Sequence, residues 1–375
     1  MYRHLALLFL IFIFTISCSD SGTETDDKDT VRFPAQGTYK GEYWPTEGWR
    51  SCKPSEVGMD SVKLMLAYQY ASDPNLNTDA LVIIKNGYVV GEAYLNGTGE
   101  TSLLDAYSVT KSFTSALVGI AIDEGVISGI NEYAYQYLPA WSLEGIPAIK
   151  KRVKLRHLIT MTGGLDWNRD TTATDDYVML LTNNYIEYVL TKNVIVEPGT
   201  EWYYSNGEAM LWSEILSYNL DRSVDIYSYQ KLQKKIGVPT IFWSSDFSGN
   251  TNTAYGMKGI AKDFAKFGYL YLKKGIWDGE RIISESWIKE STSAASEEIN
   301  FYGYYWWLPP GFESYPNYSN IPDSTFMALG ANAQRLYIVP EKDLVIVRMG
   351  HGNDSGEYAW DTMKFLSLVV DAINE

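Results

Sequence analysis

The distribution of hydrophobic and polar residues predicts strands near both ends of the folded chain. Ala80–Ile84 and Tyr88–Tyr94 are rich in β-branched and aromatic residues, and they flank Lys85-Asn86-Gly87. Asn-Gly between two such runs is the strongest short signal for a hairpin. Arg335–Val339 and Leu344–Met349 are similar runs, and they flank a turn. We therefore expect an antiparallel sheet that is completed by distant segments.

Helical patterns lie between and beyond these strands. Apolar residues recur at helical spacing in four segments, which are Asp60–Tyr70, Ser112–Glu124, Ile260–Lys273 and Trp360–Ile373. The second of these helices should begin near Tyr107–Ser108, and Gly125 is typical of a helix stop. The predicted fold class is α+β: an antiparallel sheet flanked by helices, with an inserted, mainly helical subdomain over roughly residues 126–245.

The N-terminus has the layout of a secretory signal peptide. Arg3 precedes an unbroken apolar run, Leu5–Phe14, which is too short to span a bilayer permanently. Cys18 follows Thr15-Ile16-Ser17 and resembles the lipobox cysteine of bacterial lipoproteins, although Thr15 stands where leucine is usual. We expect residues 1–17 to be removed, Cys18 to be acylated, and the protein to be anchored in a membrane facing the periplasm or the cell surface. An ordinary cleaved signal with an incidental cysteine is the alternative.

Composition limits the remaining possibilities. Ser19–Thr30 is polar and acidic, so we expect a flexible tether over residues 18–42 and one folded domain over 43–375. The net charge of −15 makes nucleic acid an unfavourable partner. The two cysteines, Cys18 and Cys52, form no CxxC or Cys/His cluster, so we predict neither a metal nor a cofactor.

The first candidate for chemistry is a Ser-x-x-Lys sequence at a helix start. Ser108 and Lys111 are three residues apart and therefore share a helical face. A serine hydroxyl needs a base to become a nucleophile, and burial lowers the pKa of a lysine enough for it to serve. The spacing alone is weak evidence, because Ser286 and Lys289 repeat it. Only the first match is followed by a long apolar helix that would bury the site.

Two further segments carry polar groups on constrained loops. Tyr204-Ser205-Asn206 follows the turn Pro198-Gly199-Thr200, and it presents a phenol and an amide. Leu329-Gly330-Ala331-Asn332-Ala333-Gln334 leads into a predicted strand, where small residues would let a substrate approach the backbone and its N–H groups. Taken singly, these two segments are better explained by a structural tyrosine and by an ordinary tight turn into a strand.

Together, and in this order, the three segments resemble the serine β-lactamase and penicillin-binding-protein superfamily. The resemblance is to its class C-like and esterase-like branch, and it covers the chain from about Trp49 to the C-terminus. It implies that Ser108 is acylated, that Lys111 and Tyr204 share the base and acid roles, and that Asn206 lies at the substrate amide. Aligned on the strand that follows, Asn332 and Gln334 also belong to the substrate site, with the Gln334 N–H as oxyanion donor.

The third segment departs from the family pattern. Ala331-Asn332-Ala333 stands where Lys-Thr-Gly is usual, so the cation that holds a β-lactam carboxylate is missing. We therefore expect an esterase, an amidase similar to 6-aminohexanoate-dimer hydrolases, or a D-amino-acid peptidase, rather than an efficient β-lactamase. The expected partner is a small-molecule or peptide-like ester or amide.

Two alternatives remain open from the sequence. A Ser-His-Asp triad would have to use His157 or His351, and there is no Gly-x-Ser-x-Gly elbow. The protein could instead be a catalytically inactive surface module that binds peptidoglycan or glycan, which the altered third segment and the many aromatic residues favour. The three intact groups Ser108, Lys111 and Tyr204 argue against this second alternative.

Overall fold

The computed structural model describes residues 29–168, 174–312, 315–352 and 360–374. The signal peptide, Cys18 and most of the acidic segment lie outside these ranges, so export and lipid anchoring stay predictions. Among the described residues, no helix is both long enough and apolar enough to cross a membrane. Cys52 is a buried free cysteine.

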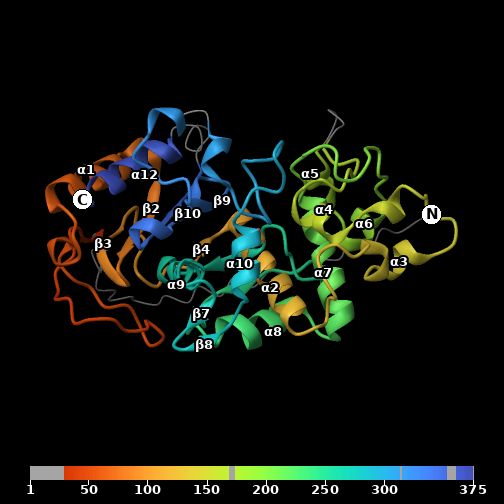
Figure 1. Ribbon diagram of the computed structural model, residues 1–375, viewed down its shortest axis with the longest axis horizontal. Helices are drawn as coiled ribbons and strands as arrows, with labels where there is room; N and C mark the ends of the chain where they lie inside the picture. The colour runs from red at the N-terminus through yellow and green to blue at the C-terminus, as the bar shows by residue number, and fades with distance from the viewer. Residues whose placement is uncertain (1–28, 169–173, 313–314, 353–359, 375) are drawn as a thin grey trace, which may run out of the picture.

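A six-stranded antiparallel sheet forms the centre of one half of the molecule (Figure 1). Its order is β1-β3-β2-β11-β10-β9, so segments from both ends of the sequence meet at the β2–β11 pair. Every residue of β2, β10 and β11 is buried, which requires cover on both faces of the sheet. The strands are β1 Thr30–Arg32, β2 Thr78–Lys85, β3 Tyr88–Tyr94, β9 Phe326–Gly330, β10 Gln334–Val339 and β11 Leu344–Gly350.

Both hairpin predictions for this sheet are confirmed. Asn86 and Gly87 have φ values of 50° and 78° between β2 and β3, as a two-residue primed turn requires. Pro340–Lys342 forms a 3-10 turn between β10 and β11. Strand β9 was not predicted, because Phe326–Gly330 is a short run with no alternation of polar and apolar residues.

The folded part begins before the predicted boundary at residue 43. Thr30–Arg32 pairs with β3 as the edge strand β1, and Phe33 is buried in the core. The expectation of a tether over residues 18–42 is therefore wrong for its last thirteen residues. Local composition favours disorder there, but the open edge of β3 supplies backbone partners that composition does not reveal.

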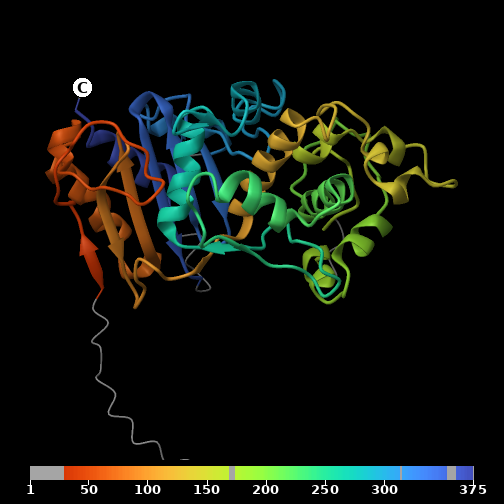
Figure 2. The ribbon, with the colours of Figure 1, turned by 90° about the horizontal axis from the view of Figure 1, so that it is seen from below.

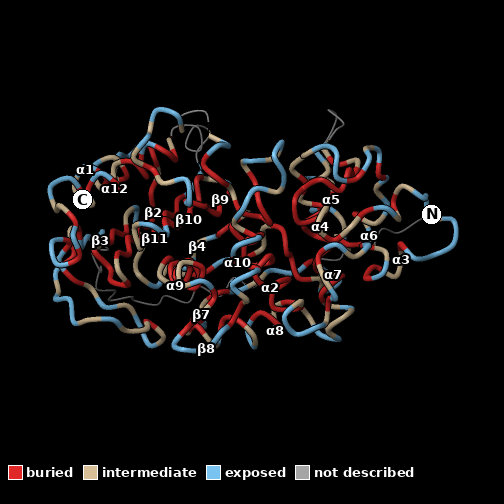
Figure 3. Tube along the Cα trace, in the orientation of Figure 1, coloured by how far each residue is buried: buried red, intermediate tan, exposed pale blue. Residues whose placement is uncertain are grey.

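Helices cover both faces of the sheet. Helices α1 (Ser61–Ala71) and α12 (Thr362–Asp371) pack together on one face, and α9 (Ala261–Leu272) packs against β2, β10 and β11 on the other. Figure 2 shows the sheet between these layers, and Figure 3 shows that buried residues concentrate in the strands and the helix faces toward them. These three helices lie within one or two residues of their predicted ranges.

Helix α2 (Thr110–Asp123) connects the sheet to a helical region. Its first twelve residues are all buried, including Lys111, Ser112 and Thr114, so both sides of the molecule pack around it. Two smaller sheets are also present: a three-stranded sheet of order β4-β6-β5 and a two-stranded sheet of β7 and β8. The remaining elements are α3 Pro139–Ser142, α4 Leu155–Ile159, α5 Asp175–Leu180, α6 Tyr185–Thr191, α7 Asn206–Leu220, α8 Val224–Ser228, α10 Glu285–Ser291, β4 Leu104–Asp105, β5 Phe242–Trp243, β6 Met257–Gly259, β7 Ile276–Trp277 and β8 Glu280–Arg281.

Candidate active site

Ser108 lies in a short 3-10 helix, Tyr107–Val109, that leads directly into α2. Tyr107 has a left-handed φ of 47°, a conformation that non-glycine residues adopt only rarely. The Thr110 hydroxyl donates to the Tyr107 carbonyl at 2.6 Å and holds the turn. The Ser108 hydroxyl is thus presented at the N-terminal end of a long buried helix, where the helix dipole favours negative charge.

Lys111 is buried beside Ser108 and has three polar contacts. It is 1% exposed, and its Nζ lies 3.0 Å from Ser108 Oγ, 2.6 Å from Asn206 Oδ1 and 2.8 Å from the Ala254 carbonyl oxygen. The last two atoms only accept hydrogen bonds. A neutral amine has two N–H bonds and one lone pair, so donation to these two acceptors turns the lone pair toward Ser108.

The environment of Lys111 favours the neutral amine. Burial lowers its pKa from 10.5 to about 7, and the carboxylate of Asp176 opposes this shift. In a substantial fraction of molecules, the Lys111 amine is therefore deprotonated at neutral pH. It can then accept the proton of a serine hydroxyl 3.0 Å away.

Tyr204 reaches the same point from the loop before α7. Ser205 caps this helix by accepting from the Glu208 N–H at 3.1 Å, which places Tyr204 and Asn206 on either side of the cap. Tyr204 lines the same pocket as Ser108, and its ring centre lies 4.9 Å from Lys111 Nζ. Burial raises the pKa of Tyr204 above its usual value of 10, which favours the protonated phenol at neutral pH.

The end of β9 lies directly against the Ser108 turn. A Cβ atom added to Gly330 would lie 2.4 Å from the Ala106 carbonyl oxygen and 3.2 Å from the Ser108 nitrogen. Only glycine permits this approach of two backbones. Ala331, the next residue, lines the pocket beside Ser108. The small residues noted in the sequence therefore serve a close backbone contact.

The structure corrects the assignment of Gln334. Its N–H donates to the Ala331 carbonyl at 3.3 Å and closes the turn between β9 and β10. Its side-chain amide exchanges hydrogen bonds with Gly350 at 2.5 and 2.9 Å and is buried inside the sheet. The alignment on β10 alone placed this residue at the pocket, because it could not account for the three-residue turn.

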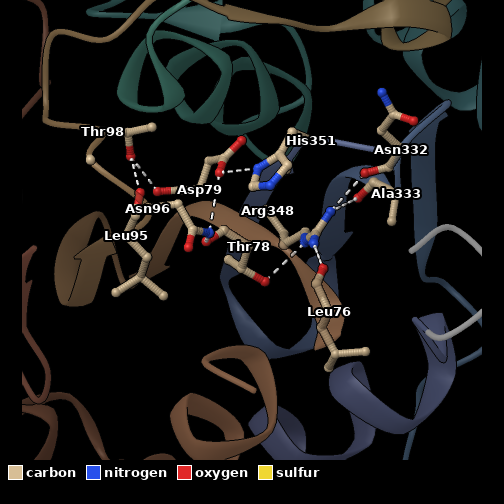
Figure 4. A network of polar contacts seen from close by, with 12 residues as sticks. Leu76, Thr78, Asp79, Leu95, Asn96, Thr98, Asn332, Ala333, Arg348 and His351 are labelled. Carbon is tan, nitrogen blue, oxygen red and sulfur yellow. Dashed lines mark hydrogen bonds and ion pairs between the residues drawn. The ribbon is translucent and has the colours of Figure 1, made fainter. Parts of the chain in front are cut away.

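Asn332 points to the turn before Ser108. Its Nδ2 donates to the Tyr107 hydroxyl at 3.2 Å. Arg348 donates to the Asn332 and Ala333 carbonyls at 2.8 and 3.1 Å, and it also contacts Thr78, as Figure 4 shows. The buried guanidinium thus anchors the turn to the central sheet, and Asn332 connects that turn to Tyr107.

Neither histidine forms a triad with Ser108. His351 Nδ1 lies 2.6 Å from Asp79 Oδ1 at the end of β11 (Figure 4). His157 Nδ1 accepts from the Lys154 N–H at 3.2 Å, and burial lowers its pKa to about 4. Neither of these contacts involves Ser108, so the structure does not support a Ser-His-Asp triad.

An open pocket of about 400 Å³ lies in front of Ser108. Sequence reasoning missed two of its lining residues, Trp307 and Arg335, because nothing in their local sequence distinguishes them. The Arg335 guanidinium donates to the Gly330 carbonyl at 3.0 Å, so a cation does line the pocket despite the altered third segment. The pocket is lined by Ser108, Tyr204, Asn206, Trp307, Leu329, Gly330, Ala331 and Arg335. Within the described part of the chain, no three His, Cys, Asp or Glu side chains are grouped closely enough to hold a metal ion.

Replacement of Gly330 by alanine should disturb this site more than the fold. The new Cβ would meet backbone atoms, which cannot move aside as a side chain can. A displacement of Ser108 by a fraction of an ångström should lower ester hydrolysis by ~10²-fold. Steady-state kinetics will measure this, with Gly129→Ala, whose Cβ meets nothing within 4 Å, as the control. Parental activity in Gly330→Ala would show that β9 does not constrain Ser108.

Comparison with known proteins agrees with this architecture. The Beta-lactamase family matches residues 69–364, and the chain belongs to that family. The 6-aminohexanoate-dimer hydrolase of Paenarthrobacter ureafaciens is 23% identical over 328 residues, which cover 79% of each protein. The resemblance to the serine β-lactamase and penicillin-binding-protein superfamily is therefore confirmed.

Solved structures show the same fold. A family VIII carboxylesterase superposes with a TM-score of 0.64 at 17% identity and covers 82% of this chain and 95% of its own. A class C β-lactamase mutant superposes with a TM-score of 0.63 at 16% identity and covers 84% and 97%. The predicted α+β fold is confirmed, and the protein is a hydrolase of the β-lactamase fold.

Proposed function

We propose that this protein cleaves an ester or amide through a covalent acyl-enzyme at Ser108. The observation that carries the proposal is the set of contacts at Lys111. Two acceptors, Asn206 Oδ1 and the Ala254 carbonyl, take the two protons of a neutral amine and leave its lone pair facing Ser108 Oγ. A nucleophile beside an oriented base is the arrangement that serine hydrolysis requires.

The first half of the reaction follows from these positions. Lys111 accepts the Ser108 proton as Oγ bonds to the substrate carbonyl carbon, and the carbonyl oxygen becomes an oxyanion. When the tetrahedral intermediate collapses, the bond to the leaving group breaks. The Tyr204 phenol gives its proton to that group, and the Lys111 ammonium returns a proton to Tyr204. A water molecule then attacks the acyl carbon by the same steps in reverse, and this attack regenerates Ser108.

The oxyanion is best served by the N–H groups of Ser108 and Ala331. The backbone of β9 approaches Ser108 closely at Gly330, and Ala331 follows directly. Within the described residues, the Ala331 N–H donates to no backbone carbonyl. Two backbone donors at the N-terminal end of a helix would stabilise a developing negative charge.

The pocket favours an ester or amide with an apolar group beside the reacting carbonyl. Trp307 stacks on Tyr204 with ring centres 6.2 Å apart and forms one wall, and Leu329 lies beside it. The third segment lacks the usual lysine or histidine, so we place this protein among the esterases and amidases of the family. The relative named 6-aminohexanoate-dimer hydrolase supports this choice.

A fluorophosphonate probe tests the proposal directly. The folded protein should be labelled at Ser108, located by peptide mapping. The labelling rate should rise with pH through a midpoint near 7, because only the neutral form of Lys111 can accept the proton and its pKa is about 7. Below that pH the ammonium has no lone pair, so the rate should fall about tenfold per unit.

Two results would contradict the proposal. The absence of label on folded protein, with a serine hydrolase labelled alongside, would favour the inactive surface-binding module. Labelling at another serine would move the site. A pH-independent rate would keep Ser108 as the nucleophile but remove Lys111 as its base.

A further inference from the structure

A carboxylate outside the predicted site is connected to Lys111 through a single side chain, that of Asn206. Asp176, at the start of α5, accepts from Asn206 Nδ2 at 2.9 Å. Its two oxygens also accept from Trp167 Nε1 at 3.2 Å and Asn168 Nδ2 at 2.7 Å. Three N–H donors, two from adjacent residues and one from the start of α7, therefore converge on one carboxylate and hold it in place.

The amide of Asn206 has two chemically different ends, and Asp176 distinguishes them. A carboxylate accepts hydrogen bonds and does not donate, so it binds the NH₂ end and excludes the carbonyl end. The Asn206 oxygen must then face Lys111, from which it accepts at 2.6 Å. If the Asn206 amide were reversed, its NH₂ group would face the Lys111 amine. The amine would then have to accept from that NH₂ group, and its lone pair would point away from Ser108.

We infer that Asp176 is a positioning residue that sets the orientation of the Asn206 amide and, through it, the direction of the Lys111 lone pair. This inference rests on the proposed function, since it concerns the base of that reaction. The Asp176 carboxylate accepts from Asn206, Trp167 and Asn168, not from Ser108, and Asp176 does not line the pocket. It therefore acts through Asn206, as the third group that orients a base.

The charge of Asp176 adds a second effect, which gives the inference a distinctive signature. Asp176 from α5 and Tyr204 from the loop before α7 are titratable groups beside Lys111. The segment before β6 presents the Ala254 carbonyl to Lys111, and its Tyr255 phenol interacts electrostatically with Asp176. The negative charge of Asp176 raises the pKa of Lys111 against the effect of burial. Removal of that charge should lower the pKa of Lys111, so the turnover should begin to rise at a lower pH. The loss of a fixed Asn206 orientation should lower the maximum turnover.

The test combines substitutions at both positions. In Asp176→Ala, the turnover of a nitrophenyl ester should fall ~10–100-fold with KM within about twofold, the loss typical of a lost supporting contact. Asn206→Ala should lose at least as much, and the double variant should be no worse than Asn206→Ala alone. Asp176→Asn keeps the size of the side chain, so it provides the pH profile even where alanine impairs folding. In this variant, the turnover should rise with pH at a lower midpoint than in the parent protein.

Asp175 provides the matched control. It is the adjacent carboxylate of α5. It accepts from the Tyr188 hydroxyl at 2.6 Å, from Lys192 and from the Asn168 backbone N–H at 2.6 Å, but not from Asn206. Asp175→Asn should therefore leave the pH profile unchanged, even where it lowers the thermal midpoint. An equal shift in Asp175→Asn would show that α5 acts only through its stability.

Other outcomes would overturn the inference and leave the proposed function intact. Additive losses from Asp176→Ala and Asn206→Ala would mean that the two residues act separately. A change confined to KM would place Asp176 in substrate binding. In both cases the fluorophosphonate label at Ser108 would persist, whereas its absence from the parent protein would refute the proposed function itself.

Discussion

Ser108→Ala is expected to abolish hydrolysis, with a loss of ~10⁴-fold or more in turnover and no fluorophosphonate label. The substitution removes the atom that would bond to the substrate carbonyl, and no other described residue supplies a nucleophile to the pocket. The fold should survive, because Ser108 contributes one hydroxyl at an open pocket. Ester hydrolysis, peptide mapping of the label and the thermal midpoint will measure these three expectations.

The chain offers its own control for this experiment. Ser286 and Lys289 form a second Ser-x-x-Lys on α10, and both residues are exposed. Ser286→Ala should therefore keep parental activity and labelling. If Ser108→Ala retained a tenth of the parental turnover, Ser108 would not be the acylated residue.

Lys111→Met is expected to reduce acylation by ~10³–10⁴-fold while the protein still binds ester. Methionine has nearly the volume of lysine and fills the same buried channel, but it has no basic atom. Lys111→Arg should lose as much, because a guanidinium keeps its proton at every relevant pH and cannot accept another. Comparison of the two variants shows whether the reaction needs a proton acceptor at this position or only a positive charge.

The pre-steady-state rate of label formation measures this prediction. Lys289→Met, in the exposed second match, should react as the parent does. Recovery of the rate at high pH in Lys111→Met would agree with the loss of a base, since hydroxide can then remove the serine proton. A Lys111→Arg variant with near-parental acylation would contradict the role of the amine.

The sequence predicted most of the secondary structure because those segments carry their own signals. The Asn86-Gly87 turn, the buried runs of β10 and β11 and the amphipathic helix α12 are each specified by residues within about fifteen positions. Strand β1 was missed because its partner, β3, lies far along the chain. Strand β9 was missed because Phe326–Gly330 is short and does not alternate, although its partner β10 follows directly after a turn. Local composition even argued against β1.

The candidate site shows the same division. The three-residue spacing of Ser108 and Lys111 and the constrained Tyr204-Ser205-Asn206 loop could be found by inspection, and the order of the segments indicated the family. Gln334 was assigned to the pocket because an alignment on one strand cannot locate the turn before it. Trp307, Arg335 and Asp176 have ordinary local sequences, so only their packing around the pocket or Asn206 identifies them.

The sequence by itself determined the class of fold, the helix that carries Ser108 and Lys111, and the family. These follow from patterns within single segments and from their order. Only the tertiary structure decided that Lys111 is buried between two acceptors, that burial raises the pKa of Tyr204, and that Asp176 accepts from Asn206. The physical reason is that pKa values and hydrogen-bond directions depend on which distant groups exclude water around a side chain, and no local pattern contains that information.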